Sequence, residues 1–384
     1  MNHIWKKKAV RAAVILILAA AFFLFLQSYN RIDKPVMVST QGRTFEQARV
    51  TEVLRDNIQE NGSRIGDQIV RLQMESGPEK GQIREANSPN GLLFGAVCYP
   101  GMRVIAIASH VGNLNVTTVY NRDRSWPVYG FILTFLALLC LIGGERGVRF
   151  ALALVFTFIC FLFLFFPMIM RGMLPFEAAA LLSALILTVT ICLINGFTVK
   201  AFSAVLSAFL GILAAGLSAF AFGWATSVSG YNVADIEQLI FVAQNTLIDV
   251  GDLLFAGILF ASLGAVMDIA MDISSAVWEI RRKNPRLSPP ELFRSGMNVG
   301  RDVMGTMSTT LILAFFGGSL GMWVLDYAYD LPYLQLINSN EVVIQILQGI
   351  SGSFGVIFAV PITSALSAWM PSLLEKIRTD RKQK

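Results

Sequence analysis

The chain has 384 residues, of which 54% are hydrophobic and only 15% are charged. Its mean hydropathy of +0.59 is far above that of a soluble domain with one core, so an ordinary soluble protein is excluded. The formal net charge of +5 arises from basic residues beside hydrophobic segments, and it gives no indication of nucleic-acid binding.

Eight hydrophobic runs come close to the length of a membrane-spanning helix, which needs roughly 20 residues to cross about 30 Å of hydrocarbon. They lie at residues 9–29, 127–142, 150–170, 176–194, 201–223, 251–272, 303–325 and 342–369. No small-x-small cleavage site follows the first run, so it is predicted to be an uncleaved anchor. We therefore predict a mainly α membrane protein with about eight transmembrane helices.

Residues 33–125 interrupt this hydrophobic pattern. They are polar and contain short runs of alternating hydrophobicity separated by glycine, proline and asparagine, which is typical of strands and turns. We predict a small exported β-barrel of five or six strands, OB-like, between helices 1 and 2. The expected domains are a basic start with the anchor at 1–32, the β domain at 33–125, a seven-helix membrane body at 126–370 and a basic tail at 371–384.

The distribution of Lys and Arg predicts the orientation, because short loops rich in these residues stay in the cytoplasm. With a cytoplasmic N-terminus, the cytoplasmic segments hold 18 of the 31 Lys and Arg, whereas the short outer loops hold one, Arg171. Both termini are then cytoplasmic and residues 33–125 are extracytoplasmic. In the longest cytoplasmic loop, Ser288, Pro289 and Glu291 form a capping-box pattern, so a helix should begin at Pro289.

Four carboxylates, Asp249, Asp252, Asp268 and Asp272, flank a stretch of fifteen residues without an ionisable side chain. A carboxylate in hydrocarbon costs several kcal/mol unless it is neutral, partnered or hydrated. Asp268 and Asp272 share one helix face, where they could share a proton or bind a cation together. Asp249 and Asp272 are about 35 Å apart along a straight helix, so both acidic pairs can equally well lie at the two membrane interfaces.

A break in this helix is predicted at Asp249, Gly251 and Asp252. The hydrophobic pattern continues upstream, and a straight helix over residues 236–280 would be about 67 Å long, too long for one span. Aspartate beside glycine favours a helix restart, and transporter sites are commonly built at such breaks. A structural and a functional role for these two aspartates are both open at this stage.

Two glycine clusters lie in the last two hydrophobic runs. Their members are Gly317, Gly318, Gly321, Gly349, Gly352 and Gly355, and Pro361 follows the second cluster. Small residues usually allow close helix packing in membranes. The alternative is a flexible backbone beside a permeation pathway, and packing is the favoured interpretation.

Enzymatic chemistry has little support in this sequence. The chain has two histidines, His3 and His110, and it contains neither a His-Glu-x-x-His pattern, a Gly-x-Ser-x-Gly elbow nor a Walker loop. No cofactor is expected, and no set of ligands specifies a metal. We expect a protein that is not an enzyme.

The run from Gly251 to Ala276 resembles the signature of the YibE/F-like bacterial membrane proteins. The resemblance extends to Ala48–Leu54 and Gly101–Val104 of the exported segment. It implies a multi-pass protein of the bacterial cytoplasmic membrane, and it allows a paralogous membrane partner as well as a homo-oligomer. It carries over no substrate and no reaction.

Two functions are compatible with these observations. The first is a secondary transporter or permease for an unidentified small solute or ion, with a proton or cation coupled at Asp249, Asp252, Asp268 or Asp272. The second is a scaffold or sensor without transport activity, whose exported β domain binds a partner. The lipid bilayer surrounds the chain in both cases.

Overall fold

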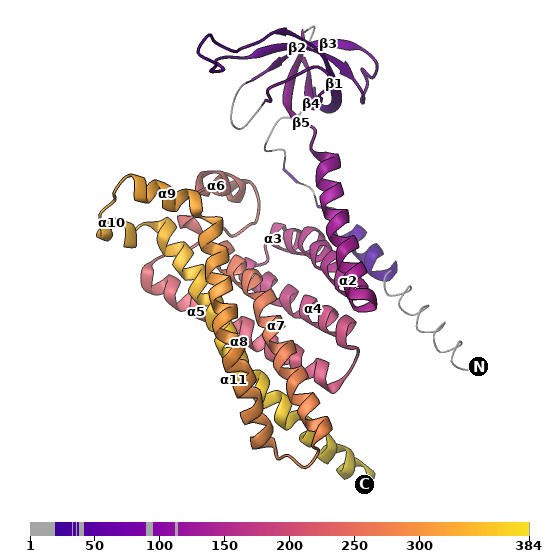
Figure 1. Cartoon of the computed structure of the whole chain (residues 1–384), viewed down its shortest axis with the longest axis vertical. Helices are drawn as coiled ribbons and strands as arrows, with labels where there is room; N and C mark the ends of the chain where they lie inside the picture. The colour runs from indigo at the N-terminus through magenta and orange to yellow at the C-terminus, as the bar shows by residue number, and fades with distance from the viewer. Residues whose placement is uncertain are drawn as a thin grey trace, which may run out of the picture. The chain divides into compact units, whose positions relative to one another are not determined.

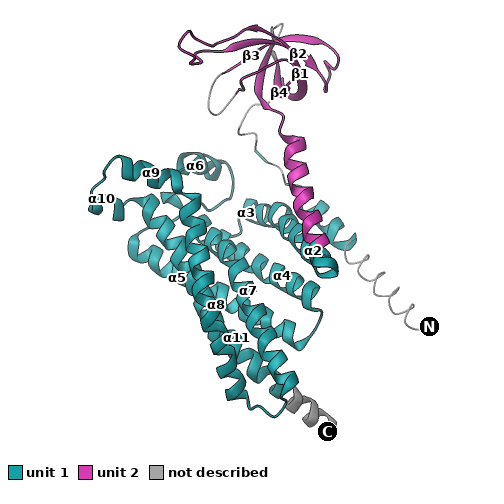
Figure 2. Cartoon of the chain, viewed as in Figure 1, with its two compact units in different colours: residues 1–35, 142–384 teal, residues 36–141 magenta. Residues whose placement is uncertain are grey.

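The computed structural model describes residues 20–32, 34–35, 37, 42–89, 95–111 and 114–383. The chain divides into two compact units, Val36–Leu141 and a second unit formed by Met1–Pro35 with Ile142–Lys384 (Figure 2). The domain boundaries that we predict from the sequence stay predictions, since the division into units falls inside a helix.

The first unit contains a five-stranded closed barrel, which confirms the predicted small β-barrel (Figure 1). Its strands are β1 (Arg43–Arg55), β2 (Gln68–Met74), β3 (Ile83–Ser88), β4 (Arg103–Val111) and β5 (Leu114–Arg122). They follow the order β1-β2-β3-β5-β4, and β3 pairs with β5 in parallel while the other pairs are antiparallel. The barrel closes because β1 is long and irregular in register, so that it bends and pairs with both β2 and β4.

Alternation along β2 shows how the sequence fills this barrel. Val70, Leu72 and Met74 are buried, and the residues between them are more exposed, as a strand with one face on the core requires. The buried Gln68 at the start of β2 accepts a hydrogen bond from the Cys98 backbone N–H at 2.7 Å. This bond ties the strand to the segment that precedes β4.

Asp56 should make the barrel sensitive to acid. Its carboxylate accepts a hydrogen bond from Gln68 Nε2 at 2.9 Å and pairs with Arg64, and these contacts, Gln68 first, lower its pKa below 3.8. A lowered folded-state pKa gives stability that is present above the unfolded pKa and lost as the pH falls through the folded pKa. We expect hydrogen-exchange protection of β2 in the full chain, corrected for intrinsic rates, to fall between about pH 5 and pH 3.

The control for this prediction is the exposed Glu60. Asp56→Asn should reduce the pH dependence of β2 protection, whereas Glu60→Gln should leave it unchanged. An unaltered pH profile in Asp56→Asn would mean that the hydrogen bond to Gln68 does not stabilise the barrel.

The second unit is helical, and Figure 1 labels its elements. An apolar helix at Ala20–Tyr29 comes first. The remaining elements are α2 (Ser125–Cys160, which begins in the first unit), η1 (Phe161–Phe165), α3 (Phe166–Met170), α4 (Pro175–Asn195), α5 (Val199–Thr226), η2 (Gly230–Asn232), α6 (Ile236–Asn245), α7 (Leu253–Lys283), α8 (Pro289–Gly318), α9 (Leu320–Ala328), α10 (Tyr333–Ile337) and α11 (Asn340–Gln383).

The predicted count of eight spans is not confirmed. Among the described residues, five helices are long and apolar enough to cross a membrane, and the number is six if α8 and α9 form one span. The predicted spans 127–142 and 150–170 lie in one helical segment, Ser125–Met170, and Gly144 between them has non-helical angles of φ 54° and ψ −134°. The predicted span 303–325 is broken at Ser319, where α8 and α9 meet at 65°. Most of the predicted anchor and the basic start lie outside the described residues.

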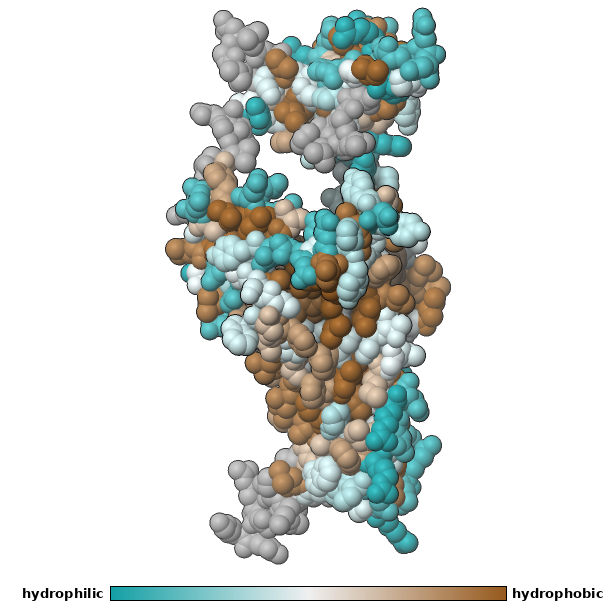
Figure 3. Space-filling view, turned by 90° about the vertical axis from the view of Figure 1, so that its left-hand side faces the viewer, coloured by the Kyte–Doolittle hydropathy of each residue, from teal (hydrophilic) through white to brown (hydrophobic). Residues whose placement is uncertain are grey.

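Helix α7 is the centre of the helical unit and packs against α4, α5, α8 and α11 (Figure 1). Leu259, Val266 and Ile273 on its inner side are fully buried. The connection at residues 284–288 joins α7 to α8, which begins at Pro289 as predicted, with the Ser288 N–H donating to the Glu291 carboxylate at 2.8 Å. On the face shown in Figure 3, hydrophobic residues dominate the middle of this unit and hydrophilic residues gather near its lower end.

The two glycine clusters differ in their surroundings. A β-carbon added at Gly355 of α11 would lie 2.8 Å from Ala215 Cβ and 3.0 Å from the Gly211 carbonyl oxygen of α5, so the two backbones approach closely there. At Gly317, Gly318 and Gly321 an added β-carbon would meet no described atom within 4 Å. Close packing therefore accounts for Gly352 and Gly355 of α11, and not for Gly349, where the nearest atom would be 3.5 Å away, or for the glycines at the α8–α9 bend.

Candidate functional site: the polar residues of α7 and α8

The chain breaks its helix before α7. Helix α6 ends at Asn245 and α7 begins at Leu253. In the link, Asp249 Oδ1 accepts a hydrogen bond from the Gly251 N–H at 2.8 Å, and the Gly251 carbonyl accepts one from the Gly230 N–H at 2.8 Å. Asp249 thus stabilises the turn that starts α7, which is a structural role. Asp252 occupies the N-cap position without a side-chain capping bond.

The last residue of α4 shows the level of Asp272 along the helices. Helix α4 has 21 residues and is therefore about 32 Å long, close to the thickness of the hydrocarbon core. The Asn195 side chain, at its last residue, donates to Met271 Sδ at 3.4 Å. Asp272 consequently lies level with the end of α4, and Asp268 lies one helical turn further in.

Both carboxylates lie on a face of α7 that no described residue covers. Asp268 and Asp272 are exposed, and so are Gly257, Ala261 and Gly264 at the same helical spacing. A β-carbon added at Gly257 or Gly264 would meet nothing within 4 Å. This outer face therefore combines small residues with two carboxylates.

Polar residues continue on α8, which runs antiparallel to α7. A β-carbon added at Gly300 would lie 2.9 Å from Ile273, and one added at Gly296 would lie 3.0 Å from Val277. Counting along the two helices from these pairs places Gly305 and Thr306 near the level of Asp268. The exposed polar residues of α8 in this region are Arg301, Asp302, Thr306, Thr309 and Thr310.

Asp302 is a residue that our sequence interpretation missed. Its signal is the spacing of Asp302, Thr306 and Thr309, which places three polar side chains on one helix face. We call the set Asp268, Asp272, Asp302, Thr306, Thr309 and Thr310 the α7–α8 polar set.

The hydrogen bonds of the polar set are local to its helices. Each threonine hydroxyl donates to a carbonyl of its own helix, for example Thr306 to Val303 at 2.8 Å and Thr310 to Thr306 at 2.9 Å. Among the described residues, Asp268 and Asp272 have no hydrogen-bond or ion-pair partner. The described part of the chain contains no group of three His, Cys, Asp or Glu arranged to hold a metal. The carboxylate oxygens are therefore available to a proton, a cation or a polar solute.

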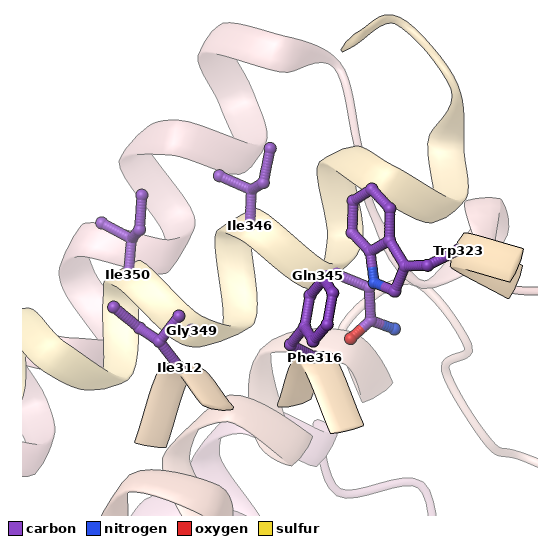
Figure 4. A pocket seen from close by; sticks show the side chains of 7 residues that line it. All are labelled: Ile312, Phe316, Trp323, Gln345, Ile346, Gly349 and Ile350. Atoms are coloured by element: carbon purple, nitrogen blue, oxygen red, sulfur yellow. The ribbon is translucent and has the colours of Figure 1, made fainter. Parts of the chain in front are cut away.

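The cavity at the α8–α9 bend is chemically different. It has a volume of about 200 Å³ and is lined by Ile312, Phe316, Trp323, Gln345, Ile346, Gly349 and Ile350. Figure 4 shows the rings of Phe316 and Trp323 beside Gln345 at one end and the isoleucines at the other. The two rings are stacked, with their centroids 5.3 Å apart. No titratable side chain lines this cavity, so it offers no group for proton coupling.

Comparison with known proteins identifies the family. The family model described as YibE/F-like protein matches residues 131–372, which is more than half of the chain. The chain belongs to the YibE/F-like family. The matched region of this YibE/F-like protein contains α4 to α10 and the whole polar set, and it does not include the barrel, so the resemblance at Ala48–Leu54 and Gly101–Val104 stays an expectation. No curated protein and no solved structure matches the chain.

Proposed function

We propose that this YibE/F-like protein is a secondary transporter or permease of the bacterial cytoplasmic membrane for a small solute or ion. In this proposal Asp268, with Asp272 one turn away, binds the coupling proton or cation. The observation that carries the proposal is the Asp268 carboxylate, exposed without a described partner one turn inside the level at which α4 ends. An ionisable group at such a depth is costly and is usually kept for function.

Two interruptions of the helices support this proposal. The α6–α7 link and the 65° bend between α8 and α9 lie at the same end of the antiparallel pair α7 and α8. Transporters commonly place their sites beside such interrupted helices, because a broken helix offers polar backbone groups and can move. Carboxylate and hydroxyl oxygens of the polar set are suitable ligands for a hard cation.

The alternative is a scaffold or sensor whose exported barrel binds a partner. It is favoured by an aromatic pair on the barrel surface, where Phe45 and Tyr120 meet edge to face with their ring centroids 5.4 Å apart. Phe45 is 58% exposed, and exposed aromatic residues are enriched in protein interfaces. The strand order β1-β2-β3-β5-β4 also suits the OB-like fold that we infer for this domain.

Flux measurements on the full chain and on a variant that lacks residues 36–122 separate the two functions. The purified chain and the deleted variant are reconstituted in vesicles that contain a pH-sensitive dye, and proton movement is driven by a potassium diffusion potential with different external cations. The transporter proposal predicts a flux above that of protein-free vesicles in both proteins, because the matched helical region holds the polar set. A scaffold predicts no flux in either protein, and that result would refute proton movement through the helical unit under these cation gradients.

A further inference from the structure

One face of α7 is left uncovered by the described residues. Its members are spaced three or four positions apart, so they follow one side of the helix, and all of them are exposed. They are Gly257, Ala261, Gly264, Asp268 and Asp272, and we call them the α7 stripe. Small residues on a membrane helix allow a second helix to approach closely.

A second uncovered face lies on α8, the neighbour of α7 (Figure 1). Its members have the same spacing and are all exposed; they are Arg301, Gly305, Thr309, Ile312 and Phe316, and we call them the α8 stripe. Arg301 has no ion pair with any described residue. An unpaired charge at the edge of the hydrocarbon is costly, so a partner that brings a carboxylate would stabilise this face.

Contacts along α7 and α8 show which residues lie at the same depth. The contacts at Gly296 and Gly300 place the two helices in one antiparallel register. The same register holds further along, because a β-carbon added at Gly352 of α11 would lie 2.5 Å from Leu311 and 3.7 Å from Ser262, two residues that it makes level. The members of the stripes are then level in pairs, which are Asp272 with Arg301, Asp268 with Gly305, Gly264 with Thr309, Ala261 with Ile312 and Gly257 with Phe316.

Level residues of the two stripes are complementary in charge and in size. Asp272 is negative where Arg301 is positive, and neither has an ion-pair partner in the described part of the chain. Gly257, which has no side chain, is level with the large ring of Phe316. All four residues are exposed, so the stripes do not satisfy one another within a single chain.

A second copy of the chain would bring level residues together. Copies in one membrane share an orientation, so the axis that relates them is parallel to the membrane normal and every residue keeps its depth. We propose that the α7 stripe of one copy packs against the α8 stripe of another, with Asp272 paired to Arg301 of the second copy. Asp268 then meets Gly305, which has no side chain, so its carboxylate stays accessible. This assembly is independent of the proposed transport activity.

Disulfide cross-linking between two differently tagged copies in membrane vesicles tests this contact. The four native cysteines of the full chain are replaced by alanine, one copy carries Ala261→Cys and the other carries Ile312→Cys. We expect oxidation with copper phenanthroline to form a product that contains both tags. Ala261→Cys with Gly305→Cys is the matched control and should form little product, because Gly305 lies about 10 Å from Ile312 along α8.

A charge exchange tests the pair of Asp272 and Arg301. Asp272→Arg in both copies places two arginines at one level and should lower the cross-linked fraction about tenfold, because like charges repel across an interface. Adding Arg301→Asp exchanges the two charges and should restore most of the product. Glu237→Arg makes a reversal of the same size at an exposed residue of α6 outside both stripes, and it should leave the product unchanged.

Melting temperatures of all variants identify any that fail to fold. Equal cross-linking of the level pair and the shifted pair would overturn the proposal, and so would a folded exchange variant that cross-links as weakly as Asp272→Arg. A product between two copies that both carry Ala261→Cys, formed in preference to the level pair, would show that α7 packs against α7 instead. No product from any pair would mean that lipid or a different protein covers the stripes.

Discussion

Asp268→Asn should reduce the proton or cation flux of the reconstituted protein to the leak of protein-free vesicles. Asparagine keeps the size and the hydrogen-bonding shape of the side chain but can neither release a proton nor balance the charge of a cation. Asp268 is expected to matter more than Asp272, since Asp272 lies level with the end of α4 and is closer to the membrane surface. Asp272→Asn should therefore leave a reduced but measurable flux.

The measurement is the initial rate of the dye signal in vesicles under a potassium diffusion potential. Asp268→Glu should recover part of the rate, because it restores a carboxylate one methylene further from the backbone. Glu237→Gln serves as the control, since Glu237 is an exposed carboxylate of α6 outside the polar set. An undiminished rate in the double variant of Asp268→Asn and Asp272→Asn would refute coupling at these carboxylates.

Gly355→Leu should strongly destabilise the helical unit. The atoms that an added side chain would meet are Ala215 Cβ at 2.8 Å and the Gly211 carbonyl oxygen at 3.0 Å. Neither can rotate away, because one is a β-carbon and the other belongs to the backbone. Overpacking of this kind typically costs about 1–3 kcal/mol, and more where the backbone must shift. We expect a clearly lower melting temperature in detergent, followed by intrinsic fluorescence.

Gly318→Leu is the matched comparison. It introduces the same side chain at the end of α8, where an added β-carbon meets no described atom within 4 Å. Its melting temperature should stay close to that of the unaltered protein. Equal melting temperatures for the two variants would show that α5 and α11 do not pack through Gly211 and Gly355.

The local features of the fold could be predicted from the sequence because each depends on a few neighbouring residues. Alternation of hydrophobic and polar residues predicts the barrel strands, and the capping-box pattern at Ser288 and Glu291 predicts the start of α8. A straight helix over residues 236–280 would be too long for one span, so an interruption is predicted before α7. The count of spans could not be predicted in this way. Gly144 divides one helical segment, and the chain bends by 65° at Ser319 between α8 and α9. Hydropathy depends on composition alone, so it predicts neither the break nor the bend.

The depth of the carboxylates depends on contacts that are distant in the sequence. Spacing places Asp268 and Asp272 on one face, but their level follows from Asn195, which meets α7 across 76 positions of the chain. The same limit applies to the glycines. Gly318 and Gly355 both lie in clusters of small residues, and only the opposing residues of α5 distinguish a packed glycine from an uncovered one.

The short connection between α7 and α8 limits how this pair of helices can deform. Residues 284–288 join the two helices, and α7 and α8 approach each other closely at Gly296 and Gly300. Because α7 and α8 are joined at one end, they can separate only towards their other ends, and the distance between them can increase only with distance from the connection. Any such spreading is small at Asp272, larger at Asp268 and largest where Ser319 lets α9 turn away.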